Sequence, residues 1–228
     1  MQRPRRRFSF SQAPGYYTPK ASALKLKPRR ISQDLRSHLG KPVIPYLTEP
    51  LNGPPGDLAA ASIIFIGGGE LAELPHLMKA LSREPLAGLP VLLHMDLVNG
   101  LANDDSGLRY LATLERLDGI ITVRPHLVPV ARKLNLLSVL RLFLQDGRAV
   151  ERGLQVIDRA QPDAVEIMPG VSFLEVSDRF SNLPMPCIAG GLIRTPDVVE
   201  RILTAGARAV STTNTALWSL NRTHRPQT

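Results

Sequence analysis

The sequence predicts an α/β fold, a single small (β/α)8 barrel of the TIM type over residues 41–228, preceded by a basic disordered tail over residues 1–40. Eight short apolar runs alternate with segments of helical periodicity, which is typical of parallel βα units. The runs are nearly continuous in Val, Ile and Leu, as strands buried on both faces are. Glycine and hydroxyl residues follow the last two runs, where such barrels bind phosphate.

The eight apolar runs are the expected strands of the barrel. In chain order they span residues 43–47, 63–67, 91–97, 119–123, 138–144, 164–168, 186–190 and 209–213. The first unit has room for only a short helix after its strand. A doubly wound open sheet would show the same local pattern, but the number of units and the phosphate signals favour a closed barrel.

Helical periodicity and capping residues mark the segments between the strands. Asp146 is placed to cap a helix that begins near Gly147, and Thr195 precedes a proline at the first helical position. Gly206 lies where a helix-ending glycine is expected. The expected helices span residues 71–81, 126–134, 147–160, 171–180 and 197–206. The glycine-rich stretch 66–71 lacks the GxxxxGK[ST] spacing and a lysine, so it predicts a turn rather than a phosphate loop.

The positive charge is concentrated at the start of the chain. Residues 1–36 hold ten basic residues and one acidic residue, whereas residues 37–228 hold 18 basic and 19 acidic residues. The tail contains prolines and no sustained apolar period, which predicts disorder. It is interpreted as an arm that neutralises RNA phosphates. The alternatives are a solubilising extension, a start codon assigned too early or an organellar transit peptide. The candidate RNA contacts are Arg5, Arg6, Arg7, Lys25, Lys27, Arg29 and Arg30.

Composition excludes two classes of protein and one kind of metal site. No stretch approaches the roughly 20 apolar residues of a membrane span. Cys187 is the only cysteine, so neither an intrachain disulfide nor a zinc site of clustered thiolates can form. The sequence therefore predicts a cytoplasmic protein with a buried thiol, and no membrane partner.

Donor groups for an anion follow the seventh and eighth expected strands. Gly190 and Gly191 allow backbone amides to approach an anion, and the loop leads into the start of a helix. Arg194 lies in the same loop, and Thr212, Thr213 and Asn214 add hydroxyl and amide groups at the next strand end. These six residues are the predicted phosphate site. The alternative is that the two glycines serve only close packing of helix on strand.

Four further polar residues are expected near the same end of the barrel. Arg141 and Glu166 lie within apolar strands, where an unpaired charge is costly, so they form either a mutual ion pair or hydrogen bonds to a polyol. His94 and Asp96 are two residues apart and should point the same way along a strand. They are consistent with a metal pair, a general base pair or hydroxyl-binding groups, but no third ligand has suggestive spacing.

Five motifs resemble, in order and spacing, the glycerol-3-phosphate-responsive antiterminator family. The resemblance covers about residues 42–220 and is strongest from residue 91. It implies a (β/α)8 barrel that binds glycerol 3-phosphate through Gly190, Gly191, Thr213 and Asn214, with His94, Asp96, Arg141 and Glu166 around the glycerol end. The motifs are HMDLVNGL (94–101), RLFLQD (141–146), EIMPGV (166–171), IAGGLIRT (188–195) and STTNTALW (211–218).

Two features depart from the family pattern. IGGGEL (66–71) stands where family members usually have an acidic or polar segment, so a ligand contact from this loop does not carry over from the resemblance. The basic tail lies outside the pattern altogether.

The resemblance implies a regulator that binds RNA rather than an enzyme. Family members loaded with glycerol 3-phosphate act on the leaders of glycerol-utilisation messages, preventing early transcription termination and affecting message stability. The expected partners are therefore glycerol 3-phosphate and leader mRNA, with no cofactor and no metal, and a homo-oligomer is left open. The alternative is a barrel isomerase, epimerase or aldolase acting on a small phosphorylated polyol or sugar, because fold alone does not decide function. The expected strands lack lysine, but Glu166 with His94 or Asp96 could still transfer a proton.

Overall fold

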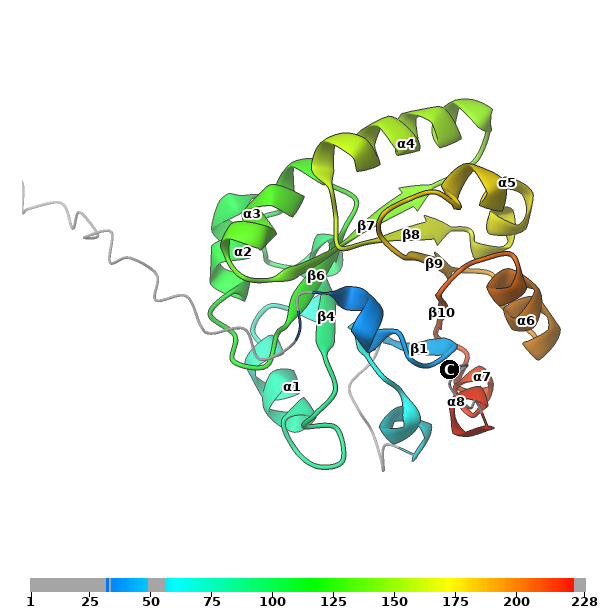
Figure 1. Ribbon diagram of the computed structural model, residues 1–228. Helices are drawn as coiled ribbons and strands as arrows, with labels where there is room; N and C mark the ends of the chain where they lie inside the picture. Colours follow the sequence, from blue (N-terminus) through cyan, green and yellow to red (C-terminus); the bar gives the residue numbers. More distant parts are fainter. Residues whose placement is uncertain (1–31, 33, 49–55, 224–228) are drawn as a thin grey trace, which may run out of the picture.

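A computed structural model describes residues 32, 34–48 and 56–223 of the 228-residue chain. Eight parallel strands close into a barrel in the order β1-β10-β9-β8-β7-β6-β4-β2, which confirms the predicted fold (Figure 1). Each strand overlaps one of the eight predicted runs. The strands are β1 (Val43–Leu47), β2 (Ile64–Ile66), β4 (Val91–His94), β6 (Gly119–Thr122), β7 (Leu137–Phe143), β8 (Ala164–Met168), β9 (Cys187–Gly190) and β10 (Ala209–Thr212).

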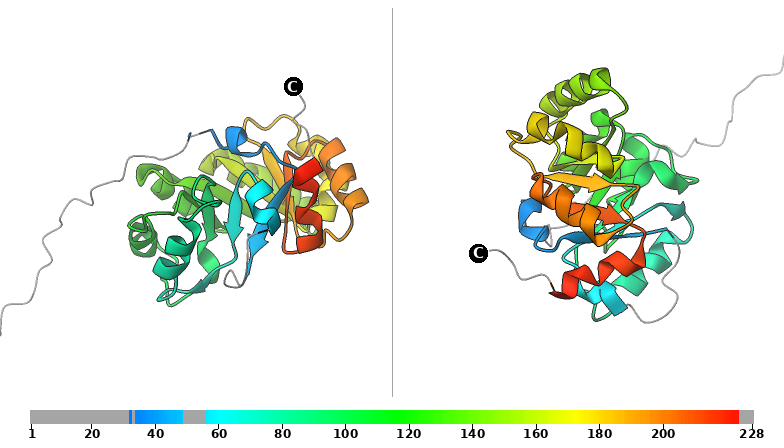
Figure 2. Two further views of the ribbon diagram at one scale, coloured as in Figure 1. Left: turned by 90° about the horizontal axis from the view of Figure 1, so that it is seen from below. Right: turned by 90° about the vertical axis from the view of Figure 1, so that its right-hand side faces the viewer.

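Helices surround the barrel, and the predicted caps form (Figure 2). The Asp146 carboxylate accepts a hydrogen bond from the Ala149 amide at 2.7 Å, and the Thr195 hydroxyl accepts one from Val198 at 3.4 Å. Gly206 has a φ of +105°, the left-handed conformation expected of a helix-ending glycine. The helices are α1 (Leu74–Leu81), α2 (Asp105–Leu111), α3 (Val128–Lys133), α4 (Gly147–Ala160), α5 (Phe173–Phe180), α6 (Pro196–Thr204), α7 (Thr215–Trp218) and α8 (Leu220–Thr223).

Short 3₁₀ helices and a second small sheet complete the described architecture. The sequence did not predict the pairing of β3 (Gly69–Glu70) with β5 (Val98–Asn99). Of the turn expected at 66–71, residues 67–68 connect β2 to β3, while Gly69 and Glu70 form a strand. Gly68 has a φ of +97°, and a Cβ there would lie 2.2 Å from the Leu97 carbonyl oxygen. The 3₁₀ helices are η1 (Leu35–His38), η2 (Gly56–Ala60), η3 (Met95–Leu97), η4 (Pro125–Leu127) and η5 (Gly170–Ser172).

Part of the segment that the sequence assigned to the tail belongs to the barrel. The Asp34 carboxylate caps η1, and Leu35 and Leu39 are each only 1% exposed. Both leucines pack with residues near the strand starts, including Ile63 and Ala209, so η1 covers the amino-terminal opening of the barrel (Figures 1 and 2). The predicted boundary at residue 40 was wrong for residues 34–40, because two leucines in a basic context give too short a signal. The seven candidate RNA contacts, Arg5 to Arg30, lie outside the described residues.

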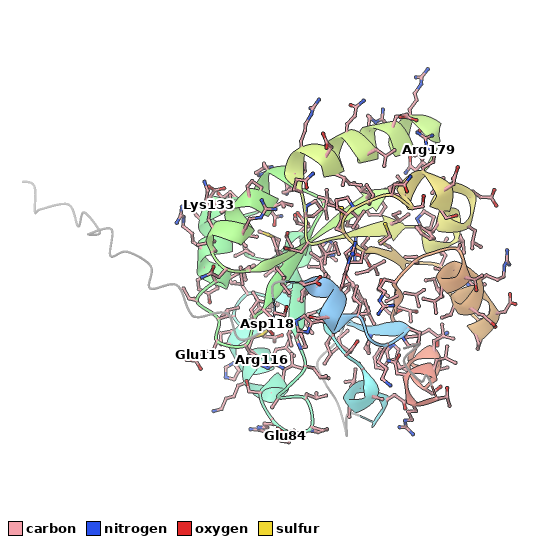
Figure 3. The ribbon with its side chains drawn as sticks, in the orientation of Figure 1. Glu84, Glu115, Arg116, Asp118, Lys133 and Arg179 are labelled. Atoms are coloured by element: carbon pink, nitrogen blue, oxygen red, sulfur yellow. The ribbon has the colours of Figure 1, made fainter. Side chains whose placement is uncertain are left out.

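A buried ion pair away from the site holds the loop after α1. Arg116 is 2% exposed and donates to the Asp118 carboxylate at 3.0 Å (Figure 3). Its guanidinium also donates to the carbonyls of Leu86, at 2.9 Å, and Leu89, and Asp118 in turn accepts from the Val91 amide at 3.0 Å. These bonds satisfy the buried charges, so the pair has a structural role.

The described residues also answer two predictions drawn from composition. Cys187 is buried in β9, as expected, and burial raises the pKa of its thiol to about 11. Among the helices that the structure describes, none has the length and apolar character needed to cross a membrane.

Candidate functional site

A pocket of about 370 Å³ opens among the carboxyl ends of β7 to β10 and β1. This is the end where barrels of this type bind their ligands. The pocket brings together five of the six predicted phosphate-site residues with the predicted pair Arg141 and Glu166. Its lining comprises Tyr46, Arg141, Glu166, Met168, Gly191, Leu192, Ile193, Arg194, Ser211, Thr212, Thr213 and Asn214.

The two glycines at the end of β9, Gly190 and Gly191, are required by the packing of the site itself. A Cβ on Gly190 would lie 2.5 Å from the Ser211 hydroxyl oxygen and 2.6 Å from a carboxylate oxygen of Glu166. Gly191 has a φ of +79°, and a Cβ there would lie 2.7 Å from the Met168 methyl group. Gly190 therefore packs directly against Ser211 and Glu166, and Gly191 lines the pocket. The crowding at both positions comes from site residues, not from a helix packing on a strand.

Among the residues at the end of β10 and just after it, Thr212 and Asn214 hold the turn together, whereas Thr213 is exposed. Thr212 accepts a hydrogen bond from the Asn214 amide at 3.1 Å, and the Asn214 side chain caps α7 by accepting from Ala216 at 3.2 Å. The Asn214 amide group also donates to the Arg194 carbonyl at 3.3 Å, which ties this turn to the β9 loop. Thr213 and the Arg194 guanidinium are exposed at the pocket. These two side chains are therefore the most accessible donors for an anion.

Arg141 and Glu166 form a buried ion pair at the inner wall of the pocket. The Arg141 Nε donates to Glu166 Oε2 at 2.7 Å, and the side chains are 6% and 0% exposed. The other carboxylate oxygen accepts from the Ser211 hydroxyl at 2.5 Å. Burial acts to lower the pKa of Arg141, but the adjacent Glu166 and Tyr46 together outweigh it and the pKa is raised. The guanidinium and the carboxyl group are thus held in fixed positions at the pocket wall.

His94 lies behind Arg141 instead of lining the pocket. Its Nδ1 is 3.0 Å from Arg141 Nη1 and 3.0 Å from the Tyr46 hydroxyl. A guanidinium can only donate, so Nδ1 is the acceptor, and we assign the proton of the neutral ring to Nε2. That nitrogen lies 3.5 Å from Asp96 Oδ2, which is too long for a good hydrogen bond. His94 therefore positions Arg141.

Asp96 faces strand β6 and its following loop. Its carboxylate accepts from the Val123 amide at 2.9 Å and from Arg124 Nε at 3.1 Å. Burial acts to raise the pKa of Asp96, but the nearby His94 ring and hydrogen bonds from Val123 and Thr122 together outweigh it and lower the pKa. Strand β4 ends at His94, and Asp96 lies in η3, which turns its side chain toward Arg124. Of the four residues predicted around the glycerol end, two line the pocket and two support it from outside.

Metal chemistry gains no support from the described ranges, 32, 34–48 and 56–223. Within them, no cluster of three or more His, Cys, Asp or Glu side chains could hold a metal ion. The His94 and Asp96 pair accordingly has no third ligand beside it.

Sequence reasoning missed two polar residues of the site, Tyr46 and Ser211. The Tyr46 ring lies 5.3 Å from the Arg141 guanidinium carbon, in cation–π contact, and burial raises the pKa of its hydroxyl. Ser211 donates to Glu166, as described above. Each is a polar residue within an apolar strand, the same signal that identified Arg141 and Glu166.

Comparisons with known proteins point to one family. The family described as glycerol-3-phosphate responsive antiterminator matches residues 58–218. A glycerol uptake operon antiterminator regulatory protein from Listeria monocytogenes is 34% identical, with 78% of this chain and 95% of that chain covered and a TM-score of 0.67. A glycerol uptake operon antiterminator-related protein from Thermotoga maritima is 30% identical, with 78% and 98% covered and a TM-score of 0.69.

One further relative and several more distant barrel structures give weaker evidence on the family. The uncharacterised protein YgcP from Escherichia coli is 28% identical over 152 residues, which is 67% of this chain and 78% of that protein. Structures named as aldolases or an epimerase are at most 15% identical and share the barrel fold alone. The family match covers most of the barrel, including the ends of β7 to β10 that line the pocket. This chain belongs to the glycerol-3-phosphate responsive antiterminator family.

Proposed function

We propose that the chain binds glycerol 3-phosphate in the pocket at the carboxyl ends of the strands and, when loaded, acts on leader mRNA to prevent early transcription termination. The observation that carries the proposal is that one pocket joins exposed anion donors to a fixed, buried polar pair. The family to which the chain belongs supports the same ligand and the same regulatory role. A protein that acts on nascent messages works in the cytoplasm, so this location belongs to the proposal.

The two ends of the pocket suit the two ends of the ligand. The phosphate would lie against the Gly191 loop, with Arg194 and Thr213 as donors, because charge-assisted hydrogen bonds to phosphate are strong. The glycerol hydroxyls would face Arg141 and Glu166, which supply a donor and an acceptor. The pocket volume of about 370 Å³ falls in the range of small-molecule sites. No cofactor is needed for this role.

The hydrogen bonding of the carboxylates favours binding over catalysis. Both oxygens of Glu166 are engaged, one by Ser211 and one by Arg141, and Asp96 is held by Val123 and Arg124. A general base needs a carboxylate that can take up a proton near neutral pH. The isomerase, epimerase or aldolase alternative predicts conversion of the ligand. We expect ³¹P NMR of glycerol 3-phosphate incubated with the protein to show the ligand unchanged.

Calorimetry should show that the phosphate group is required. We expect glycerol 3-phosphate to bind and glycerol to bind at least about 100-fold more weakly, because several charge-assisted hydrogen bonds are lost. Arg194→Gln should weaken glycerol 3-phosphate binding about 10-fold. Arg201→Gln is the matched control, because Arg201 lies on the exposed side of α6 beside Asp197. Equal affinity for glycerol and glycerol 3-phosphate would refute the proposed site.

Removing residues 1–31 tests the interpretation of the basic tail. The truncation stops before Leu35, which is buried in the barrel, so the fold should remain intact. We expect weaker RNA binding and a shallower dependence of affinity on salt, by about 0.7 in the log–log slope for each lost contact with a single-stranded phosphate. Filter binding across a salt series measures both. An unchanged slope would show that the arm makes no phosphate contacts.

A further inference from the structure

We propose that the RNA backbone docks along the outer surface of helices α3 and α4. This inference rests on the proposed function and names the surface through which the barrel itself would contact RNA. The surface is called the basic face below. Its residues are Arg132 and Lys133 of α3 and Arg148, Arg152 and Arg159 of α4, and all five are exposed.

The arginines of α4 form a single row along the helix. Arg152 is four residues after Arg148, and Arg159 is seven residues after Arg152, so all three lie on one side. The opposite side, including Val150 and Ile157, is buried against the barrel. At 1.5 Å per residue the row extends about 16 Å, enough to follow several phosphates of one strand. Nitrogen-tipped side chains project from α4 away from the barrel (Figure 3).

Helix α3 continues the row at the end of α4. Arg132 donates a hydrogen bond to the Gln161 carbonyl, directly after the last turn of α4. Lys133, the residue after Arg132, is labelled at the end of α3 in Figure 3. The basic face is therefore one continuous surface formed by two helices.

The charge of this surface differs from that of the barrel as a whole. Residues 37–228 are nearly balanced, with 18 basic and 19 acidic residues, whereas α3 and α4 together hold five basic and two acidic residues. One of these acids, Glu151, is turned toward α5 and pairs with Arg179 at 2.6 Å. Within the part of the chain that the structure describes, the three arginines of the α4 row have no acidic partner at ion-pair distance. Arg is well suited to phosphate because its planar guanidinium binds two oxygens at once.

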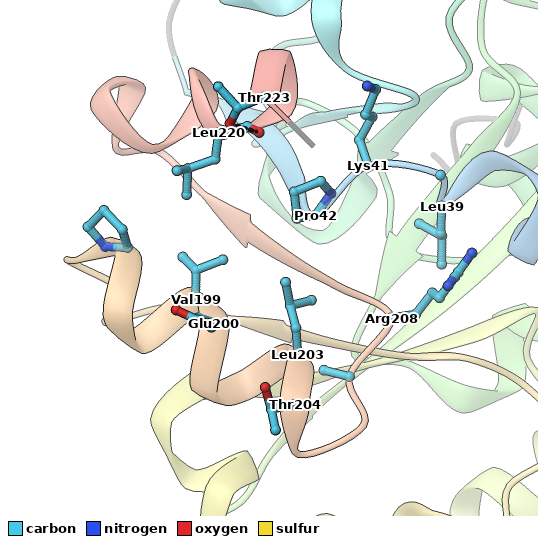
Figure 4. A pocket seen from close by; sticks show the side chains of 13 residues that line it. Leu39, Lys41, Pro42, Val199, Glu200, Leu203, Thr204, Arg208, Leu220 and Thr223 are labelled. Atoms are coloured by element: carbon cyan, nitrogen blue, oxygen red, sulfur yellow. Dashed lines mark hydrogen bonds between the residues drawn. The ribbon is translucent and has the colours of Figure 1, made fainter. Parts of the chain in front are cut away.

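Another large surface feature is less suited to a polyanion. A groove of about 640 Å³ lies between α6 and α8 (Figure 4). Its lining mixes Lys41 and Arg208 with Glu200 and several apolar side chains. Repulsion between a polyanion and Glu200 would offset its attraction to one of the two basic residues. The basic face carries a clear excess of one sign, so charge complementarity favours it.

The basic face lies one strand away from the ligand pocket. In strand β7, Arg141 lines the pocket. The next residue, Leu142, and Leu144 just after the strand pack against Gly153 of α4. A Cβ on Gly153 would lie 3.1 Å from Leu142 Cδ1, so the helix is seated closely on the strand. A change at Arg141 on ligand binding would therefore act on the strand that supports α4.

The test uses an RNA enriched from a random-sequence pool on the full-length chain with glycerol 3-phosphate present. The triple variant Arg148→Gln, Arg152→Gln, Arg159→Gln should bind this RNA at least about 10-fold more weakly. Its log–log salt slope should fall by about 2, because three phosphate contacts are lost. The control triple variant, Lys79→Gln, Arg83→Gln, Arg201→Gln, removes the same charge from the region of α1 and α6. It should bind within about twofold of the wild type, since its loss of charge is remote from the face.

The outcomes separate this inference from the proposed function. Calorimetric binding of glycerol 3-phosphate to the α4 triple variant should be unchanged, which shows that the barrel and pocket are intact. Normal RNA binding by that variant, or an equal loss in the control variant, would overturn the basic face and leave the proposed function standing. Failure of the wild-type chain to enrich any RNA would overturn both.

Discussion

Replacing Arg141 with methionine is expected to lower the free energy of unfolding by about 3 to 5 kcal/mol and to abolish binding of glycerol 3-phosphate. The carboxylate of Glu166 has no exposed surface, and in the variant it would keep only the Ser211 hydroxyl as a partner. An uncompensated buried charge is among the most destabilising changes a core can suffer. Urea unfolding followed by circular dichroism measures stability, and calorimetry measures binding.

The double variant Arg141→Met, Glu166→Gln is the control for this prediction. Removing both charges leaves neither uncompensated, so a large part of the lost stability should return. Ligand binding should not return, because both polar groups at the pocket wall have been replaced. A double variant no more stable than Arg141→Met alone would show that the ion pair does not account for the loss.

Replacing Gly190 with alanine should reduce affinity for glycerol 3-phosphate about 100-fold, or about 2.7 kcal/mol. The new methyl group would lie within 2.6 Å of both the Ser211 hydroxyl and the Glu166 carboxylate, so one of them must move. These groups hold each other and Arg141, and a shift of the network displaces the polar wall of the pocket. The stability cost should be about 1 to 3 kcal/mol, as for other overpacked sites. Calorimetry and thermal unfolding give the two quantities.

Gly147→Ala is the matched control for Gly190→Ala. No atom lies within 4 Å of a Cβ built on Gly147, and its φ is not positive, so the added methyl meets open space. This variant should bind ligand and unfold as the wild type does. Wild-type affinity in Gly190→Ala would mean that the network adjusts without disturbing the pocket.

Much of the barrel could be predicted because buried strands have a strong sequence signature. All eight apolar runs became strands, and the caps at Asp146 and Thr195 form as expected. Arg141 and Glu166 were identified because a charge within an apolar strand requires a partner. Their pairing follows from the register of β7 and β8, where the two residues are opposite each other.

The remaining features of the fold and of the site depend on contacts between distant parts of the chain, which local sequence does not encode. Tyr46 reaches Arg141 and His94 only because β1 closes the barrel against β10 and β2. Asp96 lies 3.5 Å from His94, but it also accepts hydrogen bonds from Val123 and Arg124, because it lies in a 3₁₀ turn beyond the strand end, and alternation along a strand does not predict those contacts. Leu35 and Leu39 became part of the core because the amino-terminal end of the barrel leaves an apolar opening to fill.

The closure of that opening by η1 has a consequence for the exchange of small molecules. Leu35 and Leu39 fill the amino-terminal opening among the strand starts, and the ligand pocket that the described residues form opens at the carboxyl-terminal end. The helices run antiparallel to the strands, so the end of α4 with Arg159 and the end of α3 with Lys133 lie toward the closed side. A polymer bound along the outer surface of α3 and α4 would lie beside the barrel and not across the open end. Glycerol 3-phosphate could then enter and leave the pocket while RNA stays bound. Occupancy of the pocket would follow the cellular concentration of glycerol 3-phosphate without release of the RNA.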